Sequence, residues 1–259
     1  ANALNALTYG SQSPALSVAT KLGSISTANS SFATSGQESP LISNAGRIEL
    51  DNVSGEADNS PIAMLRDAGS LIVQGSRLVS SQQQQAPTEP TTGAITLYRE
   101  DATNLETLHE NTVFQADGSS IKSDLKTESL FYVTNTRAKI LLSNTSLEFD
   151  DASMPLLMAV GNNANGWGTQ GSNGASVTFT AANQTLQGDV IVDVQSSVDL
   201  FLLDSSNWRG SARNVASASN SLTSDQLNVS IDSGSTWVVS SNSSVTNLNL
   251  APGARLVDP

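Results

Sequence analysis

The sequence predicts an all-β chain that winds into a right-handed, single-stranded parallel β-helix, a solenoid of roughly 9 to 11 coils with short loop insertions. Three observations carry this prediction. A phrase of short alternating strands returns at a fixed spacing, residues that favour strands outnumber those that favour helices, and turn residues separate the apolar runs. Residues 1–259 are therefore expected to form a single β-helix domain.

The repeat is clearest in the first third of the chain. A glycine followed by alternating apolar and polar residues recurs with a spacing of 23 residues, at Gly23, Gly46 and Gly69. A second phrase, Ser-Pro followed by apolar residues, keeps rough step with it, at Ser13, Ser39 and Ser60. A period in the twenties is typical of a β-solenoid, in which each coil buries its inward residues only because neighbouring coils cover them.

Asparagine recurs directly after three predicted strands, as Asn29, Asn52 and Asn144. At a corner, Asn tolerates the left-handed conformation, and stacked equivalents can hydrogen-bond to one another. We interpret these residues as structural corners. They also match the acceptor sequence for N-glycosylation, which would apply if the source were eukaryotic.

Two insertions interrupt the later repeats. One is rich in Gln and Pro and runs from Gln82 to Gly93, and the other is rich in Gly, runs from Gly161 to Gly174 and holds Trp167. Loops on a rigid scaffold often carry binding residues, although surface loops are also simply tolerated.

Composition limits the possible functions. The chain has no cysteine, which excludes disulfides and thiolate metal sites and is compatible with crossing a periplasm unfolded. A net charge of −12 argues against nucleic acid as a partner. There is no apolar run of about 18 residues or more and no signal-peptide pattern at the start, so export and anchoring segments are expected to lie outside these residues.

The C-terminal third carries a family resemblance. Its phrases are, in order, Leu186-Gln-Gly-Asp189, Asn207-Trp208-Arg-Gly210, Ser230-Ile-Asp232 leading to Thr236-Trp237, and Asn242-Ser-Ser-Val245 leading to Leu248-Asn-Leu250. This order resembles the end of pertactin-like autotransporter passengers. The resemblance covers residues 186–259, whereas residues 1–185 share only a β-helical texture with that family.

The resemblance implies a bacterial protein displayed at the cell surface or secreted, attached to the outer membrane only through a translocator barrel outside these residues. It implies that residues 186–259 form a stable core that templates folding. The function it favours is an adhesin that binds a host extracellular-matrix protein or glycan, or other copies of itself in aggregation and biofilm. Two alternatives stay open: a stalk that displays a missing N-terminal functional region, and a polysaccharide-degrading β-helix enzyme.

A search for catalytic chemistry favours a non-enzyme with no cofactor and no metal. His109 is the single histidine, so any Ser-His-Asp triad must use it. The string Asp232-Ser-Gly-Ser235 resembles a protease nucleophile turn but lies inside a strand motif, where a corner is expected. The pair Asp150-Asp151 is the closest candidate for lyase carboxylates, and we expect it at a turn.

The candidate ligand-binding residues are one aromatic side chain and a group of cations. Trp167 is able to stack on a sugar or enter a partner's pocket, or to pack back onto the rod. The cations, which are close in sequence within an acidic chain, are Lys122, Lys126, Arg137 and Lys139. They are suited to sulfates or carboxylates of a ligand, or to neutralising Asp124 and Glu128.

Overall fold

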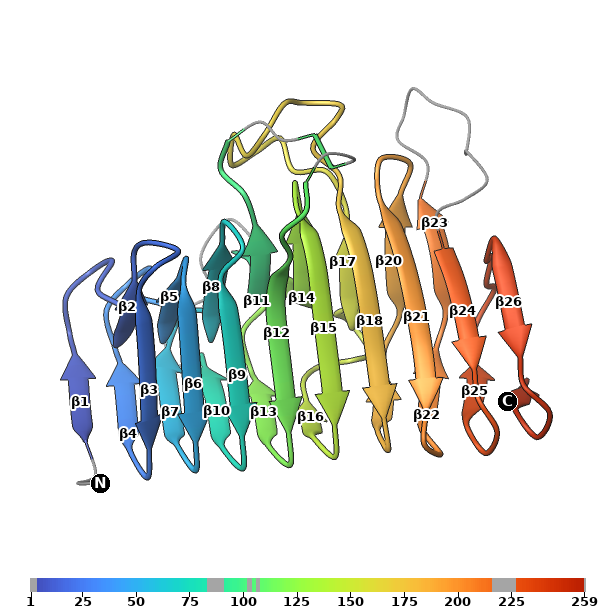
Figure 1. The fold of residues 1–259 in the computed structure, drawn as a ribbon, viewed down its shortest axis with the longest axis horizontal. Coiled ribbons are helices and arrows are strands. Elements are labelled where there is room, and N and C mark those ends of the chain that lie inside the picture. The colour runs from blue at the N-terminus through green and yellow to red at the C-terminus, as the bar shows by residue number, and fades with distance from the viewer. Residues whose placement is uncertain (1–3, 83–90, 102–103, 106–107, 216–226, 259) are drawn as a thin grey trace.

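The computed structural model describes residues 4–82, 91–101, 104–105, 108–215 and 227–258. Within these ranges all regular elements are strands, and all their pairings are parallel. The chain is a parallel β-helix whose coils stack along one axis, with the two termini at opposite ends (Figure 1). Most coils contribute one strand to each of three walls.

The three walls can be followed through the strand order. The first wall combines a six-stranded and a four-stranded sheet: β1 (Asn5–Thr8), β4 (Ser31–Thr34), β7 (Ser54–Asp58), β10 (Arg77–Ser81), β13 (Ser120–Ser123) and β16 (Ser146–Glu148), then β19 (Thr185–Gln187), β22 (Asn207–Gly210), β25 (Thr236–Val239) and β27 (Arg255–Val257). The second wall is an eight-stranded sheet: β2 (Leu16–Val18), β5 (Ile42–Asn44), β8 (Ala63–Arg66), β11 (Thr91–Tyr98), β14 (Thr127–Thr134), β17 (Leu157–Ala159), β20 (Val190–Asp193) and β23 (Ala212–Val215). The third wall is a nine-stranded sheet: β3 (Ser24–Ala28), β6 (Arg47–Asp51), β9 (Ser70–Gln74), β12 (Thr112–Asp117), β15 (Arg137–Ser143), β18 (Ser176–Ala182), β21 (Ser197–Leu203), β24 (Leu227–Ile231) and β26 (Asn247–Leu250).

The register confirms the repeat that the glycines predict. Ser24 pairs with Arg47, and Arg47 pairs with Ser70, so Gly23, Gly46 and Gly69 precede equivalent strands. The next pairing joins Ser70 to Val113, because insertions lengthen that coil. The Gln- and Pro-rich insertion is shorter than predicted, since β11 already begins at Thr91; its residues 83–90 lie outside the described part of the chain.

A single apolar core runs along the inside of the rod. Alternate residues of each strand point inward, as in β15, where Ala138, Ile140 and Leu142 are buried. The ring of Phe131 lies 5.4 Å from that of Phe114 and 6.0 Å from that of Phe179, so aromatic contacts link successive coils. Without its neighbours, a single coil would therefore expose its apolar face to water.

The asparagine corners are confirmed. Seven stacked residues, the corner column, adopt a left-handed conformation with φ between 48° and 55°: Asn29, Asn52, Gly75, Gly118, Asn144, Asn183 and Asp204. The Nδ2 of Asn52 donates to Oδ1 of Asn29 at 2.6 Å, and Asn183 donates in the same way to Asn144. Glycine at two places interrupts this amide ladder.

A second ladder, formed by buried hydroxyls, follows directly after the corner column. The backbone N–H of Val53 donates to Oγ of Ser76 at 2.9 Å. In later coils, the N–H of Gln184 donates to Oγ of Ser206, and the N–H of Ser206 donates to Oγ of Ser235, at 3.0 Å each. Each donor belongs to the coil before its acceptor. Because a strand corner leaves backbone N–H groups without a partner in its own coil, these hydroxyls satisfy them inside the rod.

The C-terminal tryptophans stack inside the last coils. Trp208 and Trp237 are 0% and 2% exposed, with ring centroids 4.6 Å apart and an angle of 11° between the planes. Trp208 donates from Nε1 to the carbonyl of Gly188 at 2.9 Å, and Trp237 donates to that of Gly210 at 3.0 Å. The glycine is needed because a Cβ at residue 210 would lie 2.1 Å from the Gly188 oxygen.

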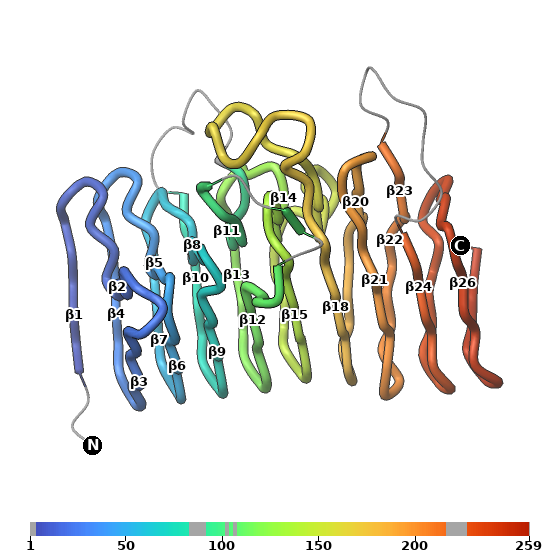
Figure 2. The backbone as a smooth tube through the Cα atoms, turned by 45° about the horizontal axis from the view of Figure 1, so that its top comes forward, coloured from blue at the N-terminus to red at the C-terminus, as the bar shows by residue number. Residues whose placement is uncertain are grey.

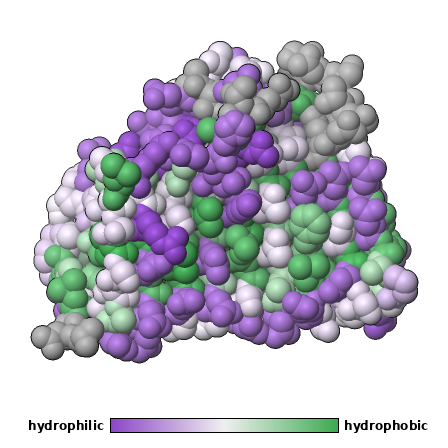
Figure 3. Space-filling model, viewed as in Figure 1, coloured by the Kyte–Doolittle hydropathy of each residue, from purple (hydrophilic) through white to green (hydrophobic). Residues whose placement is uncertain are grey.

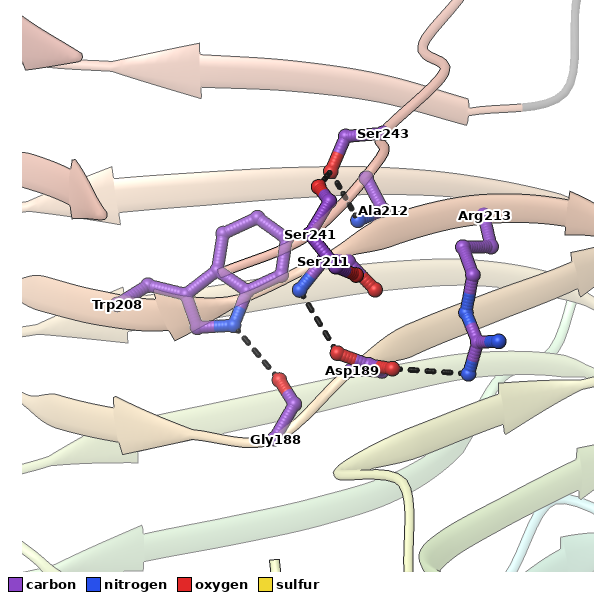
Figure 4. A network of polar contacts seen from close by, with 8 residues as sticks. All are labelled: Gly188, Asp189, Trp208, Ser211, Ala212, Arg213, Ser241 and Ser243. Atoms are coloured by element: carbon purple, nitrogen blue, oxygen red, sulfur yellow. Dashed lines mark hydrogen bonds and ion pairs between the residues drawn. The ribbon is translucent and has the colours of Figure 1, made fainter. Parts of the chain in front are cut away.

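A polar corner next to Trp208 is drawn in Figure 4. Asp189 accepts the backbone N–H of Ser211 at 2.8 Å and pairs with Arg213 at 2.8 Å, while Ser243 accepts the N–H of Ala212 at 3.1 Å. The aspartate of the Gln-Gly-Asp phrase therefore fastens the next coil.

Candidate functional site

The glycine-rich loop that carries Trp167 is fastened at its base. Asn173, which is buried, donates from Nδ2 to the carbonyl of Asn162 at 2.6 Å and to that of Trp167 at 2.7 Å. The N–H of Gly168 donates to the carbonyl of Glu100 at 2.9 Å. The loop thus lies against the segment that follows β11, at the edge of the rod seen at the top of Figure 2.

Trp167 packs back onto the rod with one face of its ring. Its centroid lies 4.1 Å from that of Tyr98, with an angle of 29° between the planes, and the side chain is half-buried. Burial, with a smaller contribution from Glu100, raises the pKa of Tyr98 to about 12. The indole therefore has one covered face, and its remaining surface is what a ligand is able to reach.

The four cations divide between two walls. Lys122 lies in β13 of the first wall and Lys126 just after it, whereas Arg137 and Lys139 lie in β15 of the third wall. Closeness in sequence therefore does not place them on one face. The reason is geometric, since a chain that turns two corners within 17 residues faces a different direction after each.

Some of these cations are also paired with neighbouring residues of the chain. Lys122 pairs with Glu148 at 2.6 Å and Asp124 at 3.6 Å, and the hydrogen bond to Glu148 raises the pKa of Lys122. Arg137 donates to the carbonyl of Leu105 at 3.4 Å. Lys126 and Lys139 are exposed.

The candidate catalytic residues lie in separate parts of the structure. Ser235 is fully buried at a corner, where it accepts the N–H of Ser206 and its Oγ lies 2.5 Å from Oδ1 of Asp232, as expected for a corner. His109 is exposed, and Asp150 and Asp151 lie at a turn. Within the described ranges, no group of three His, Cys, Asp or Glu residues is placed to hold a metal ion.

The outer face of the third wall carries a further candidate that sequence reasoning missed. A hollow of about 490 Å³ lies over β21, β24 and β26, and the outward side chains that line it are Asp199, Phe201, Asn228, Ser230, Asn247 and Asn249. We call these six residues the lateral array. The signal in the sequence is Phe201, an aromatic residue at an outward position of a strand whose other alternates, Val198, Leu200 and Leu202, are buried.

Comparisons of the chain with protein-family models, with curated proteins and with solved structures give no match. In the described part of the chain, no helix has the length and apolarity needed to cross a membrane. What defines the chain is its fold: a parallel β-helix with laddered corners, an inserted loop that carries a stacked tryptophan, and a lateral wall that mixes polar and apolar side chains.

Proposed function

We propose that this chain is an adhesive β-helix of the autotransporter-passenger type, displayed at a bacterial cell surface, and that it attaches to a host matrix protein or glycan, or to other copies of itself, through its lateral surface. The observation that carries the proposal is the outward face of the third wall. It is a broad, regular surface on which apolar side chains lie among polar ones (Figure 3). Such a surface offers many weak contacts, which suits attachment by multiple copies.

The outward positions of the third wall support this reading in detail. One row of paired positions reads Ser26, Glu49, Ile72, Gln115, Leu141, Thr180, Phe201, Ser230 and Asn249 along the rod. Outward Ile72, Leu141 and Phe201 are partly exposed rather than covered by another layer of the protein. Partly exposed apolar groups set among hydrogen-bonding groups are typical of interaction surfaces.

The test is binding without turnover. The chain, coupled to beads at high density, is incubated with matrix proteins and with a glycan panel, and reducing ends are measured in parallel. Retention without new reducing ends supports adhesion. Release of reducing ends would replace the proposal by a polysaccharide-degrading enzyme, and absence of retention on every surface, including beads carrying the chain itself, would replace it by a stalk.

Two variants separate the candidate anchors. If Trp167 is an anchor, Trp167→Ala should abolish retention, and retention by the unchanged protein should resist salt. If Lys122 and Lys126 are anchors, reversing both charges should weaken retention on an anionic glycan, and salt should do the same because exposed charges are screened beyond ~8 Å. Retention that survives both changes would assign attachment to the third wall.

A further inference from the structure

The lateral array is ordered in two directions by the parallel register. Across the strands, Asp199 pairs with Asn228 and Asn228 with Asn247. Two residues further along, Phe201 pairs with Ser230 and Ser230 with Asn249. With ~4.8 Å between strands and ~6.6 Å between alternate residues, the array covers about 10 by 7 Å.

The amides of the array point along the rod in a chain of hydrogen bonds. Asn247 donates from Nδ2 to Oδ1 of Asn228 at 2.7 Å, and Asn228 donates to Oδ1 of Asp199 at 2.8 Å. In the second row, Asn249 donates to Oγ of Ser230 at 3.3 Å. Each amide has two N–H groups and one oxygen with two lone pairs, so these bonds orient the side chains and leave further donors and acceptors facing the hollow.

Phe201 supplies the apolar part of the same surface. Its side chain is half-buried and lines the hollow, while its strand neighbours Leu200 and Leu202 point into the core. The next outward residue in the same row is Thr180, which is not aromatic. Phe201 is therefore the residue in this part of the row that offers an aromatic ring to the hollow. A fixed ring beside oriented amides and a carboxylate matches a ligand that has one apolar face and polar edges.

The charge of the hollow narrows the ligand class. Among the residues that the structure describes, its lining contains one carboxylate, Asp199, and no Lys or Arg. Because sulfated and carboxylated ligands would meet repulsion there without a compensating cation, the hollow does not suit an anionic glycan. A pyranose with C–H groups on one face and hydroxyls at its edge fits both the ring and the amides.

We propose that the lateral array binds a neutral saccharide, with Phe201 stacking on a sugar face and with Asp199, Asn228 and Asn247 hydrogen-bonding to its hydroxyls. The array has room for about a disaccharide. This proposal names a ligand class for the attachment surface and in that sense rests on the proposed function, but saccharide binding is measured on the protein in solution and needs no attachment.

The experiment compares two substitutions in one row of the wall. Phe201→Thr removes the ring from the array, and Leu141→Thr makes a similar apolar-to-polar change two strands away, with the natural Thr180 between them. Asn228→Ala is a second array variant at a partly exposed position. Saturation-transfer NMR and titration calorimetry with maltose, cellobiose, lactose and chitobiose measure binding, with a heparin disaccharide as the anionic probe, and thermal unfolding monitors each variant's fold.

At least one neutral disaccharide is expected to bind, with an affinity that is unchanged between about 0.05 and 0.5 M salt. Phe201→Thr and Asn228→Ala should each weaken binding about tenfold or more, and Leu141→Thr should leave it within about twofold. The proposal is overturned if no neutral disaccharide binds, if only the heparin disaccharide binds, or if Leu141→Thr is as damaging as Phe201→Thr. It is also overturned if Phe201→Thr alters only self-association in sedimentation while saccharide binding persists.

The outcomes for the two proposals are distinct. Retention on matrix or cells that is indifferent to Phe201→Thr, with no disaccharide bound, would remove the saccharide site and leave the adhesive function standing. Disaccharide binding lost in Phe201→Thr, with no retention on any surface, would keep the saccharide site and remove the adhesive function.

Discussion

Completing the amide ladder of the corner column should stabilise the protein. The ladder is interrupted at Gly75 and Gly118, which adopt φ of 53° and 55°, and a Cβ added at either position would meet no atom within 4 Å. The flanking amides belong to Asn52 on one side and Asn144 on the other. Gly75→Asn and Gly118→Asn therefore place an amide where the backbone already suits asparagine.

The expected increase in the free energy of unfolding has two contributions. Replacing glycine by a residue that tolerates the native φ contributes about 0.4–1 kcal/mol through the unfolded state, and one exposed hydrogen bond adds about 0.5 kcal/mol. Each single substitution creates one new link, to Asn52 or to Asn144, and should add about 1 kcal/mol. The link to Asn144 competes with its present bond to Asp117 at 3.3 Å, which is long and readily replaced.

The double variant tests the ladder itself. With both substitutions, a third link forms between the two new amides, so the double change should exceed the sum of the single changes by about 0.5 kcal/mol. Thermal unfolding should shift by about 2–4 °C for each kcal/mol. Gly75→Ala is the control, because it adds a side chain at positive φ without an amide and should destabilise. Strict additivity, or equal effects of Ala and Asn, would refute the reasoning.

Three further predictions concern the core and its pH dependence. Trp237→Ala should lower the free energy of unfolding in urea by about 3–5 kcal/mol, because the substitution removes the stacked, hydrogen-bonded indole, and Trp237→Phe should be clearly milder. A loss below about 1 kcal/mol would contradict the burial of the Trp237 side chain. Ser206→Ala should cost about 1–3 kcal/mol by leaving the N–H of Gln184 without its acceptor, and hydrogen exchange at Gln184 should accelerate. Burial raises the pKa of Glu128, so its contribution to stability is present below the unfolded-state pKa and is lost as pH rises through the folded-state pKa. Glu128→Gln should therefore raise the melting temperature at pH ~7 and change it little below pH ~4. An equal change in melting temperature at both pH values would exclude the raised pKa of Glu128 as its cause.

The fold was predictable because the strongest signals in the chain are local and repeated. The spacing of Gly23, Gly46 and Gly69 and the corner asparagines follow directly from residue type, since few residues tolerate those corners. The hydroxyl ladder was not predictable. Two of its positions are occupied by Val53 and Gln184, which have no hydroxyl, and the hydrogen-bond partners lie a whole coil away, so no short motif marks the ladder.

The candidate site was predictable only in part. Trp167 stands out by type, but its contact with Tyr98 joins the glycine-rich insertion to the end of strand β11, and no periodicity describes how an insertion packs on a strand. The cations are close in sequence yet belong to two walls, because corners between strands change the direction of the side chains. Phe201 becomes visible only when the pairing of β21 with β24 places Asn228 and Ser230 beside it.

The direction of the hydrogen bonds has a mechanical consequence. Strands lie across the rod and their hydrogen bonds run along it, so tension applied between the two ends would open one coil at a time instead of shearing many bonds together. Each 23-residue coil that opens would release about 75 Å of extended chain in place of about 5 Å of rod. Under hydrodynamic drag the molecule would lengthen in steps at modest force, and the unopened coils would keep their surfaces intact.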